Sequence, residues 1–167
     1  NDAVKIPQIL YNVPSRTGCD LENDTVISLS KLSNIIGIKD ATGELERINY
    51  LKEKVKNDFI FISGDDLTFL RYMERGGCGV ISVTANVRPD LMHNICHSFL
   101  NGDIENSKII NNQLSTLHEV MFIDSNPMPV KWLLNYLGLI SKGIRLPLVE
   151  LDKKYQTNLI KAFESIK

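Results

Sequence analysis

The sequence contains few cysteines and no long apolar run. Its three cysteines, Cys19, Cys78 and Cys96, are widely spaced and form no Cys-x-x-Cys pair. A disulfide framework is therefore not expected, and a reducing cytoplasm fits best. No apolar stretch approaches the roughly 20 residues of a membrane-spanning helix, and the first residues do not resemble a signal peptide. These absences predict a cytoplasmic protein with no membrane partner.

The sequence also has no marked excess of positive or negative charge. The chain has 19 basic and 20 acidic residues, without a run of Lys and Arg, so a general surface for nucleic acid is not expected. Hydrophobic residues make up 43% and charged residues 23%, as in a folded globular protein. The 167 residues suit one domain, but a complete (β/α)8 barrel needs about 250.

Short apolar runs alternate with helical patterns in the first half of the chain. The runs are rich in β-branched and aromatic residues and are apolar on both faces, which is typical of parallel strands covered on both sides. They cover residues 9–13, 35–39, 59–63 and 79–84. Apolar residues at helical spacing predict helices between them, over residues 25–32, 45–55 and 67–75.

Only helical patterns follow the fourth run. They cover residues 91–100, 104–122, 130–137 and 148–163. The whole order predicts an α/β fold class, in which four parallel strands with their helices precede a helical C-terminal region.

Lys39 is the first candidate for chemistry, because it ends an apolar run and precedes the segment Asp-Ala-Thr-Gly. Ligands of parallel βα folds bind at the carboxyl ends of the strands. Apolar neighbours disfavour the ammonium form of a lysine, and its neutral amine can condense with a ketone to a Schiff base. Tyr11 holds the matching position in the preceding run, where a phenol can relay protons. A solvated Lys39 and a core Tyr11 are the alternatives.

The loops after the first and third runs hold further candidates. Arg16 follows the first run, where it can bind a carboxylate with two hydrogen bonds or remain a plain surface charge. Asp65 and Asp66 follow Gly64 at the end of the third run. No further metal-ligand pattern accompanies these two carboxylates, so we interpret them as helix caps and expect no metal site.

Five motifs occur in the order seen in the dihydrodipicolinate synthase family, and the sequence resembles this family from near Pro7 to near its end. The motifs are YNVPSRTG at 11–18, GIKDATG at 37–43, SGDD at 63–66, GVISVTAN at 79–86 and NPMPVK at 126–131. The family is a class I aldolase-type (β/α)8 TIM barrel with extra C-terminal helices. The resemblance implies that residues 1–88 form the second half of this barrel and carry the catalytic motifs. Residues 89–167 would form the last barrel helix and the C-terminal helices.

The resemblance also implies a role for each candidate. Lys39 would form the imine with pyruvate, and Tyr11 would relay protons. Arg16 would bind the carboxylate of L-aspartate 4-semialdehyde. The backbone at Ile81 would lie against pyruvate, and the loop after Gly64 would line the pocket. The expected product is 4-hydroxy-tetrahydrodipicolinate, an intermediate of lysine and diaminopimelate biosynthesis. No cofactor is expected, because Lys39 is itself the electron sink.

Other interpretations stay open. N-acetylneuraminate lyase and related pyruvate aldolases share the tyrosine and the lysine, although the loop PSRTG at 14–18 resembles the synthase. The family's first half-barrel, with a threonine pair and a second tyrosine of the proton relay, is missing from the sequence. We therefore expect a fragment, one chain of a split enzyme or a truncated non-catalytic protein, inactive alone and with open sheet edges. The full-length family suggests a homotetramer.

Overall fold

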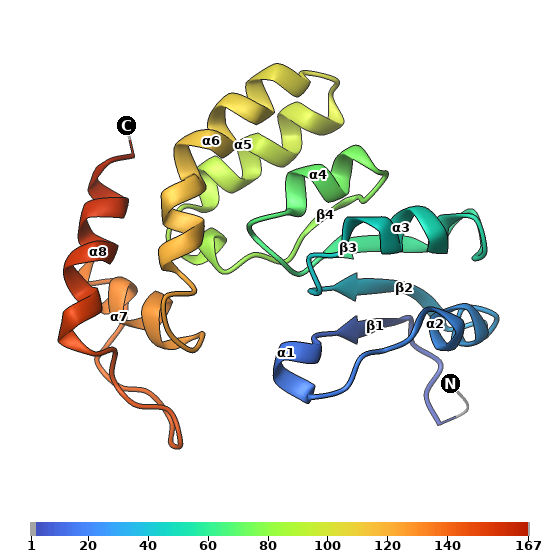
Figure 1. Cartoon of the computed structure of the whole chain (residues 1–167), viewed down its shortest axis with the longest axis horizontal. Helices are drawn as coiled ribbons and strands as arrows, with labels where there is room; N and C mark the ends of the chain where they lie inside the picture. Colours follow the sequence, from blue (N-terminus) through green and yellow to red (C-terminus); the bar gives the residue numbers. More distant parts are fainter. Residues whose placement is uncertain (1–2, 167) are drawn as a thin grey trace. The chain divides into compact units, whose positions relative to one another are not determined.

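The computed structural model describes residues 3–166. The chain consists of two compact units, Asn1–Ile81 and Ser82–Lys167. The first unit is built on a four-stranded parallel sheet with the order β1-β2-β3-β4 (Figure 1). Its strands are β1 (Gln8–Asn12), β2 (Ile35–Asp40), β3 (Ile60–Ser63) and β4 (Gly79–Val80). The four parallel strands predicted from the apolar runs are therefore present.

Helices follow the first three strands. They are α1 (Pro14–Thr17), α2 (Asn23–Leu29), α3 (Leu45–Lys52) and α4 (Phe69–Glu74). Three of the four correspond to predicted helices, whereas α1 lies in a segment that the sequence analysis interprets as a loop. The strands and helices share one apolar core, and burial of each large side chain in it stabilises the fold by about 1.5–3 kcal/mol. The core consists of Val26, Ile35, Ile38, Ile48, Leu51, Phe59, Phe61 and Tyr72.

The two faces of the sheet differ in burial. In β1, Ile9 and Tyr11 are 43% and 53% exposed, whereas Asn12 is buried. In this chain β1 is therefore covered on one side only, whereas its apolar run predicts cover on both sides. An apolar run alone does not say what covers each face, and here Leu10 packs against the helix-covered core while Ile9 and Tyr11 point away from it.

The fourth strand is shorter than predicted. The apolar run predicts a strand over residues 79–84, but β4 ends at Val80 and Thr84 begins a 3-10 helix, η1 (Thr84–Asn86). The backbone N–H of Ala85 donates to the Ser82 hydroxyl at 3.0 Å. This local hydrogen bond favours a turn over a strand, because it offers the backbone a partner outside the ladder.

The second unit is helical. It contains η1 and the helices α5 (Pro89–Leu100), α6 (Ile104–Val120), α7 (Met128–Tyr136) and α8 (Lys153–Glu164). Helix α5 packs against α6, and both α6 and α7 contact α8. A helix was predicted from residue 148, but α8 begins later, because Asp152 caps it by accepting a hydrogen bond from the Lys154 N–H at 3.0 Å. Among residues 3–166, no helix is both long and apolar enough to cross a membrane.

Candidate functional site

All five site residues predicted from the sequence lie near the carboxyl ends of strands in the first unit. Tyr11 lies in β1 and Lys39 in β2, each one residue before the end of its strand. Gly64 follows β3 directly, Ile81 follows β4 directly, and Arg16 lies on α1 just after β1. Since the strands are parallel, their carboxyl ends meet at one edge, which is where ligands bind in such folds.

Tyr11 and Lys39 are direct neighbours across the sheet. They are register partners in the β1–β2 ladder, so both side chains leave the sheet on the same face. The Lys39 Nζ atom lies 4.0 Å from the centroid of the Tyr11 ring, close enough for a cation–π interaction. Lys39 is half-buried and Tyr11 is 53% exposed. The prediction that Lys39 and Tyr11 lie close together on adjacent strands is therefore confirmed.

Gly64 makes room for the Lys39 side chain. A Cβ atom added at Gly64 would lie 2.8 Å from the Lys39 Cε atom and 2.8 Å from the Ala41 Cβ atom. The Gly64 N–H also donates to the Asp40 carbonyl at 2.7 Å. The stem of Lys39 thus lies directly against the Gly64 backbone, a close approach that only glycine permits.

Arg16 and Ile81 are both exposed. The short helix α1 begins with Pro14 and ends at Thr17, and Gly18 caps it with a φ of 67° in the left-handed region. This turn presents Arg16 on its outer side. Ile81 is 53% exposed, and its backbone N–H donates to the Ser63 carbonyl at 2.9 Å. The roles expected for the two residues toward substrates stay predictions.

A buried polar cluster, missed in the sequence, lies behind the site. We call it the Arg47 network, and it consists of Asn12, Asp20, Asp40 and Arg47. Arg47 of α3 donates from Nη1 to the Asp20 carboxylate at 2.8 Å and from Nη2 to the Leu21 carbonyl at 2.7 Å. Its Nε atom lies 3.4 Å from the Asp40 carboxylate. Asn12 donates to the other Asp20 oxygen at 2.8 Å. The guanidinium thus contacts the end of β2 directly, and Asp20 connects it to Asn12 at the end of β1.

The two carboxyl groups of the network experience different environments. Burial raises the pKa of Asp40, against the hydrogen bonds from Thr42 and the charge of Arg47. The pKa of Asp20 is lowered, chiefly by the hydrogen bond from Asn12 and further by Arg47, although burial opposes both. Asp20 is therefore the partner whose charge the network stabilises more strongly.

Sequence signals for this network exist, but they are weak. Asn12 is a polar residue within an apolar run, Asp40 directly follows another, and Arg47 interrupts a helical apolar pattern. Each of these features is common at the surface of a protein. The contact between Arg47 and Asp20, 27 residues apart, is visible only once the strands are paired.

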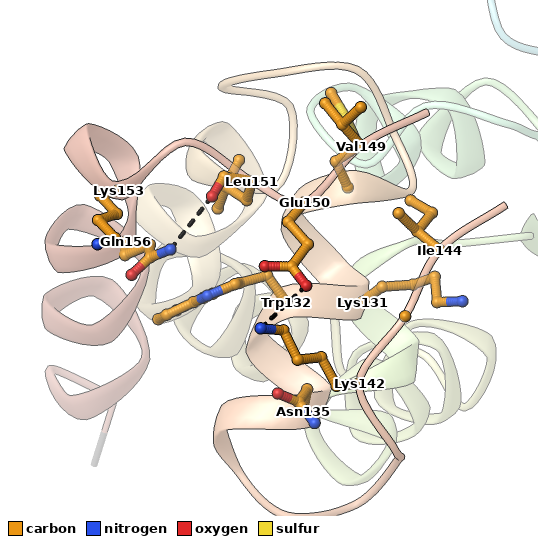
Figure 2. Close-up of a pocket in the computed structure, with 12 residues that line it drawn as sticks. Lys131, Trp132, Asn135, Lys142, Ile144, Val149, Glu150, Leu151, Lys153 and Gln156 are labelled. Carbon is orange, nitrogen blue, oxygen red and sulfur yellow. Dashed lines mark hydrogen bonds and ion pairs between the residues drawn. The ribbon is translucent and has the colours of Figure 1, made fainter. Parts of the chain in front are cut away.

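A pocket is present in the second unit, between α7, α8 and the segment that joins them (Figure 2). Its volume is about 300 Å³. Trp132 and Lys131 line it from α7 and Lys153 from α8, and Lys142 forms an ion pair with Glu150 at 3.1 Å within it. None of the site residues predicted from the sequence lines this pocket. In the described part of the chain, no group of three or more His, Cys, Asp or Glu side chains is placed to hold a metal ion.

Comparisons with known proteins agree with one another. The family model described as "Dihydrodipicolinate synthetase family" matches residues 2–166. The 4-hydroxy-tetrahydrodipicolinate synthase of Buchnera aphidicola subsp. Baizongia pistaciae is 51% identical over 97% of the chain, and that of Stutzerimonas stutzeri is 52% identical over 96%. The chain spans only 55% of the length of each.

A solved structure gives the same result. The chloride-inhibited dihydrodipicolinate synthase of Acinetobacter baumannii, complexed with pyruvate, superposes with a TM-score of 0.94 at 45% identity. The match covers 99% of this chain and 57% of that one. The predicted fold class, four parallel strands of a (β/α)8 barrel followed by C-terminal helices, is thereby confirmed.

Proposed function

The chain belongs to the dihydrodipicolinate synthetase family, and we propose that its Lys39 forms an imine with pyruvate. This imine would begin the condensation of pyruvate with L-aspartate 4-semialdehyde to 4-hydroxy-tetrahydrodipicolinate, a lyase reaction of lysine and diaminopimelate biosynthesis. The observation that carries the proposal is the Lys39 amine, held 4.0 Å from the Tyr11 ring at the carboxyl edge of the sheet. Pyruvate in the Acinetobacter baumannii relative supports the choice of ketone.

The first chemical step uses Lys39 and Tyr11. The Lys39 Nζ atom attacks the ketone carbon of pyruvate to give a carbinolamine, and loss of water leaves the imine. Tyr11 serves as the proton relay, delivering a proton to the departing hydroxyl group and accepting one in return. The protonated imine withdraws electrons from the methyl group, which loses a proton to give the enamine.

The second substrate enters at the enamine. The nucleophilic carbon of the enamine attacks the aldehyde of L-aspartate 4-semialdehyde, while the exposed Arg16 binds its carboxylate. The amino group of the semialdehyde then attacks the imine carbon, which closes the ring and releases Lys39 as a free amine. The Ile81 backbone and the loop after Gly64 form the pocket for pyruvate.

The wider setting of the reaction is part of the proposal. The chain spans about half the length of the relatives that it matches, and we propose that the remaining groups of the family's proton relay belong to the half that the match does not cover. We propose that residues 1–88 carry the catalytic motifs and residues 89–167 the last barrel helix and the C-terminal helices. We also propose that the active form is a cytoplasmic homotetramer, as the family resemblance suggests.

Borohydride trapping tests the imine. The polypeptide that the gene encodes is incubated with pyruvate and sodium borohydride, and digested peptides are analysed by mass spectrometry. We expect the reduced pyruvate adduct on Lys39 and no adduct in Lys39→Arg, which keeps the charge but cannot form an imine. An adduct on another lysine, or none with pyruvate, would overturn the proposal.

A further inference from the structure

We propose that the Arg47 network positions Lys39 and Tyr11 for imine formation. This inference rests on the proposed function of these two residues. Asn12 and Asp40 are buried, and Asp20 and Arg47 contact them, so we treat the four as positioning residues rather than catalytic ones. The argument depends on how a β-strand alternates its side chains.

Each reacting residue is followed directly by a buried network residue. Asn12 follows Tyr11 and Asp40 follows Lys39, and the two are register partners, as Tyr11 and Lys39 are. Successive side chains of a strand point to opposite faces. Asn12 and Asp40 therefore fix the strand ends from behind, 1% and 4% exposed, while Tyr11 and Lys39 face the other side.

The backbone around these residues is also held in place. The Ala41 N–H donates to the Asn12 carbonyl at 2.9 Å, and the Gly64 N–H donates to the Asp40 carbonyl at 2.7 Å. These two bonds continue the ladder to the carboxyl edge, across β1, β2 and β3. The Thr42 N–H donates to the Asp40 carboxylate at 3.1 Å. The loop that follows Lys39 is thus fastened to the same carboxylate.

Only an arginine can make the bridge at the centre of the network. The planar guanidinium of Arg47 donates hydrogen bonds to the Asp20 carboxylate and the Leu21 carbonyl, and its Nε atom lies 3.4 Å from the Asp40 carboxylate as an ion pair without a hydrogen bond. A lysine has one ammonium group without this fixed fork. The side chain of Arg47 is 9% exposed, so water does not replace a lost bond easily. Losing the fork would let the ends of β1 and β2 shift relative to each other.

The test compares Arg47→Lys with Arg75→Lys in the polypeptide that the gene encodes. Arg75 also pairs with a carboxylate of α3, that of Glu46 at 3.7 Å, but lies outside the network. The rate of borohydride trapping on Lys39 is measured against pyruvate concentration, per folded molecule. We expect the maximum rate of Arg47→Lys to fall about tenfold or more, since a misplacement of about 1 Å can cost about 100-fold. The concentration for half-saturation should change much less, and Arg75→Lys should match the unchanged protein.

A second variant keeps the test informative if Arg47→Lys does not fold. Asp20→Asn has almost the same shape, and the side chain that it replaces is 29% exposed, so we expect it to fold. It should slow trapping in the same direction. In the double variant the two effects should be less than additive in free energy, because both break one network.

The outcomes separate this inference from the proposed function. If folded Arg47→Lys or Asp20→Asn traps pyruvate at the unchanged maximum rate, the network is merely structural and the inference is wrong. If the unchanged protein gives no adduct on Lys39, the proposed function fails and this inference fails with it. A fall in melting temperature alone, without a slower maximum rate, would also count against positioning.

Discussion

Replacing Gly64 by alanine should slow imine formation at Lys39 and also destabilise the fold. The added methyl carbon would lie 2.8 Å from the Lys39 Cε atom and 2.8 Å from the Ala41 Cβ atom. Carbon atoms in contact prefer about 3.5–4.0 Å. Each contact is therefore short by about 0.7–1.2 Å, and at least one of the neighbours has to move.

The two neighbours do not move equally easily. The Ala41 Cβ atom is bonded to the backbone, whereas the Lys39 Cε atom is near the end of a flexible side chain. We therefore expect Lys39 to give way, and a displacement of about 1 Å at a reacting group costs up to about 100-fold in rate. The remaining overpacking against Ala41 should lower the free energy of unfolding by about 1–3 kcal/mol.

Single-turnover borohydride trapping with saturating pyruvate measures the first effect, and urea unfolding measures the second. Gly77→Ala is the matched control, because its methyl group would lie 2.5 Å from the Tyr72 Cδ1 atom and would not meet Lys39. This control should be destabilised but should trap pyruvate at the unchanged rate per folded molecule. Unchanged trapping in Gly64→Ala, or equal slowing in Gly77→Ala, would refute the reasoning.

Two further predictions concern Arg16 and Asp20. Arg16→Ala should weaken the use of L-aspartate 4-semialdehyde by about 10- to 100-fold, the effect of losing a charged hydrogen-bond pair, and should leave pyruvate trapping on Lys39 unchanged. Steady-state kinetics beside trapping would show this, and an equal loss of both would point to another role. Because the pKa of Asp20 is lowered on folding, its charge stabilises the fold at neutral pH, and this contribution is lost as pH falls below about 4. The difference in unfolding free energy between the unchanged protein and Asp20→Asn should therefore shrink from pH 7 to pH 3; a constant difference would contradict the assignment.

The strands and the facing pair could be predicted because their signals are local. The apolar runs that became β2 and β3 differ from the observed strands by one residue at one end, and the run that became β1 is shifted by one residue. Lys39 closes its run and Tyr11 lies two residues before the end of the preceding one, and parallel pairing makes the two register partners. The fourth run predicts a strand that is too long. Its β-branched residues favour a strand, but the Ser82 hydroxyl accepts a hydrogen bond from the Ala85 N–H and favours a turn there.

The buried polar residues behind the site could not be predicted in the same way. Asn12, Asp40 and Ser63 lie side by side in the register of β1, β2 and β3, and each is at most 4% exposed. In the sequence they are single polar residues at the ends of apolar runs, which usually indicates a solvated end. Asp40, for example, is paired with Arg47, which comes from a helix later in the chain.

The alternation of a strand explains why the two kinds of residue occur together. A side chain that reacts at the carboxyl edge needs a fixed backbone, and the next residue along the strand points to the opposite face. A polar residue there can be anchored by helices without blocking the substrate. Tyr11 with Asn12 and Lys39 with Asp40 follow this arrangement. A polar residue directly after a candidate catalytic residue in an apolar run is therefore better interpreted as a possible anchor than as a solvated strand end.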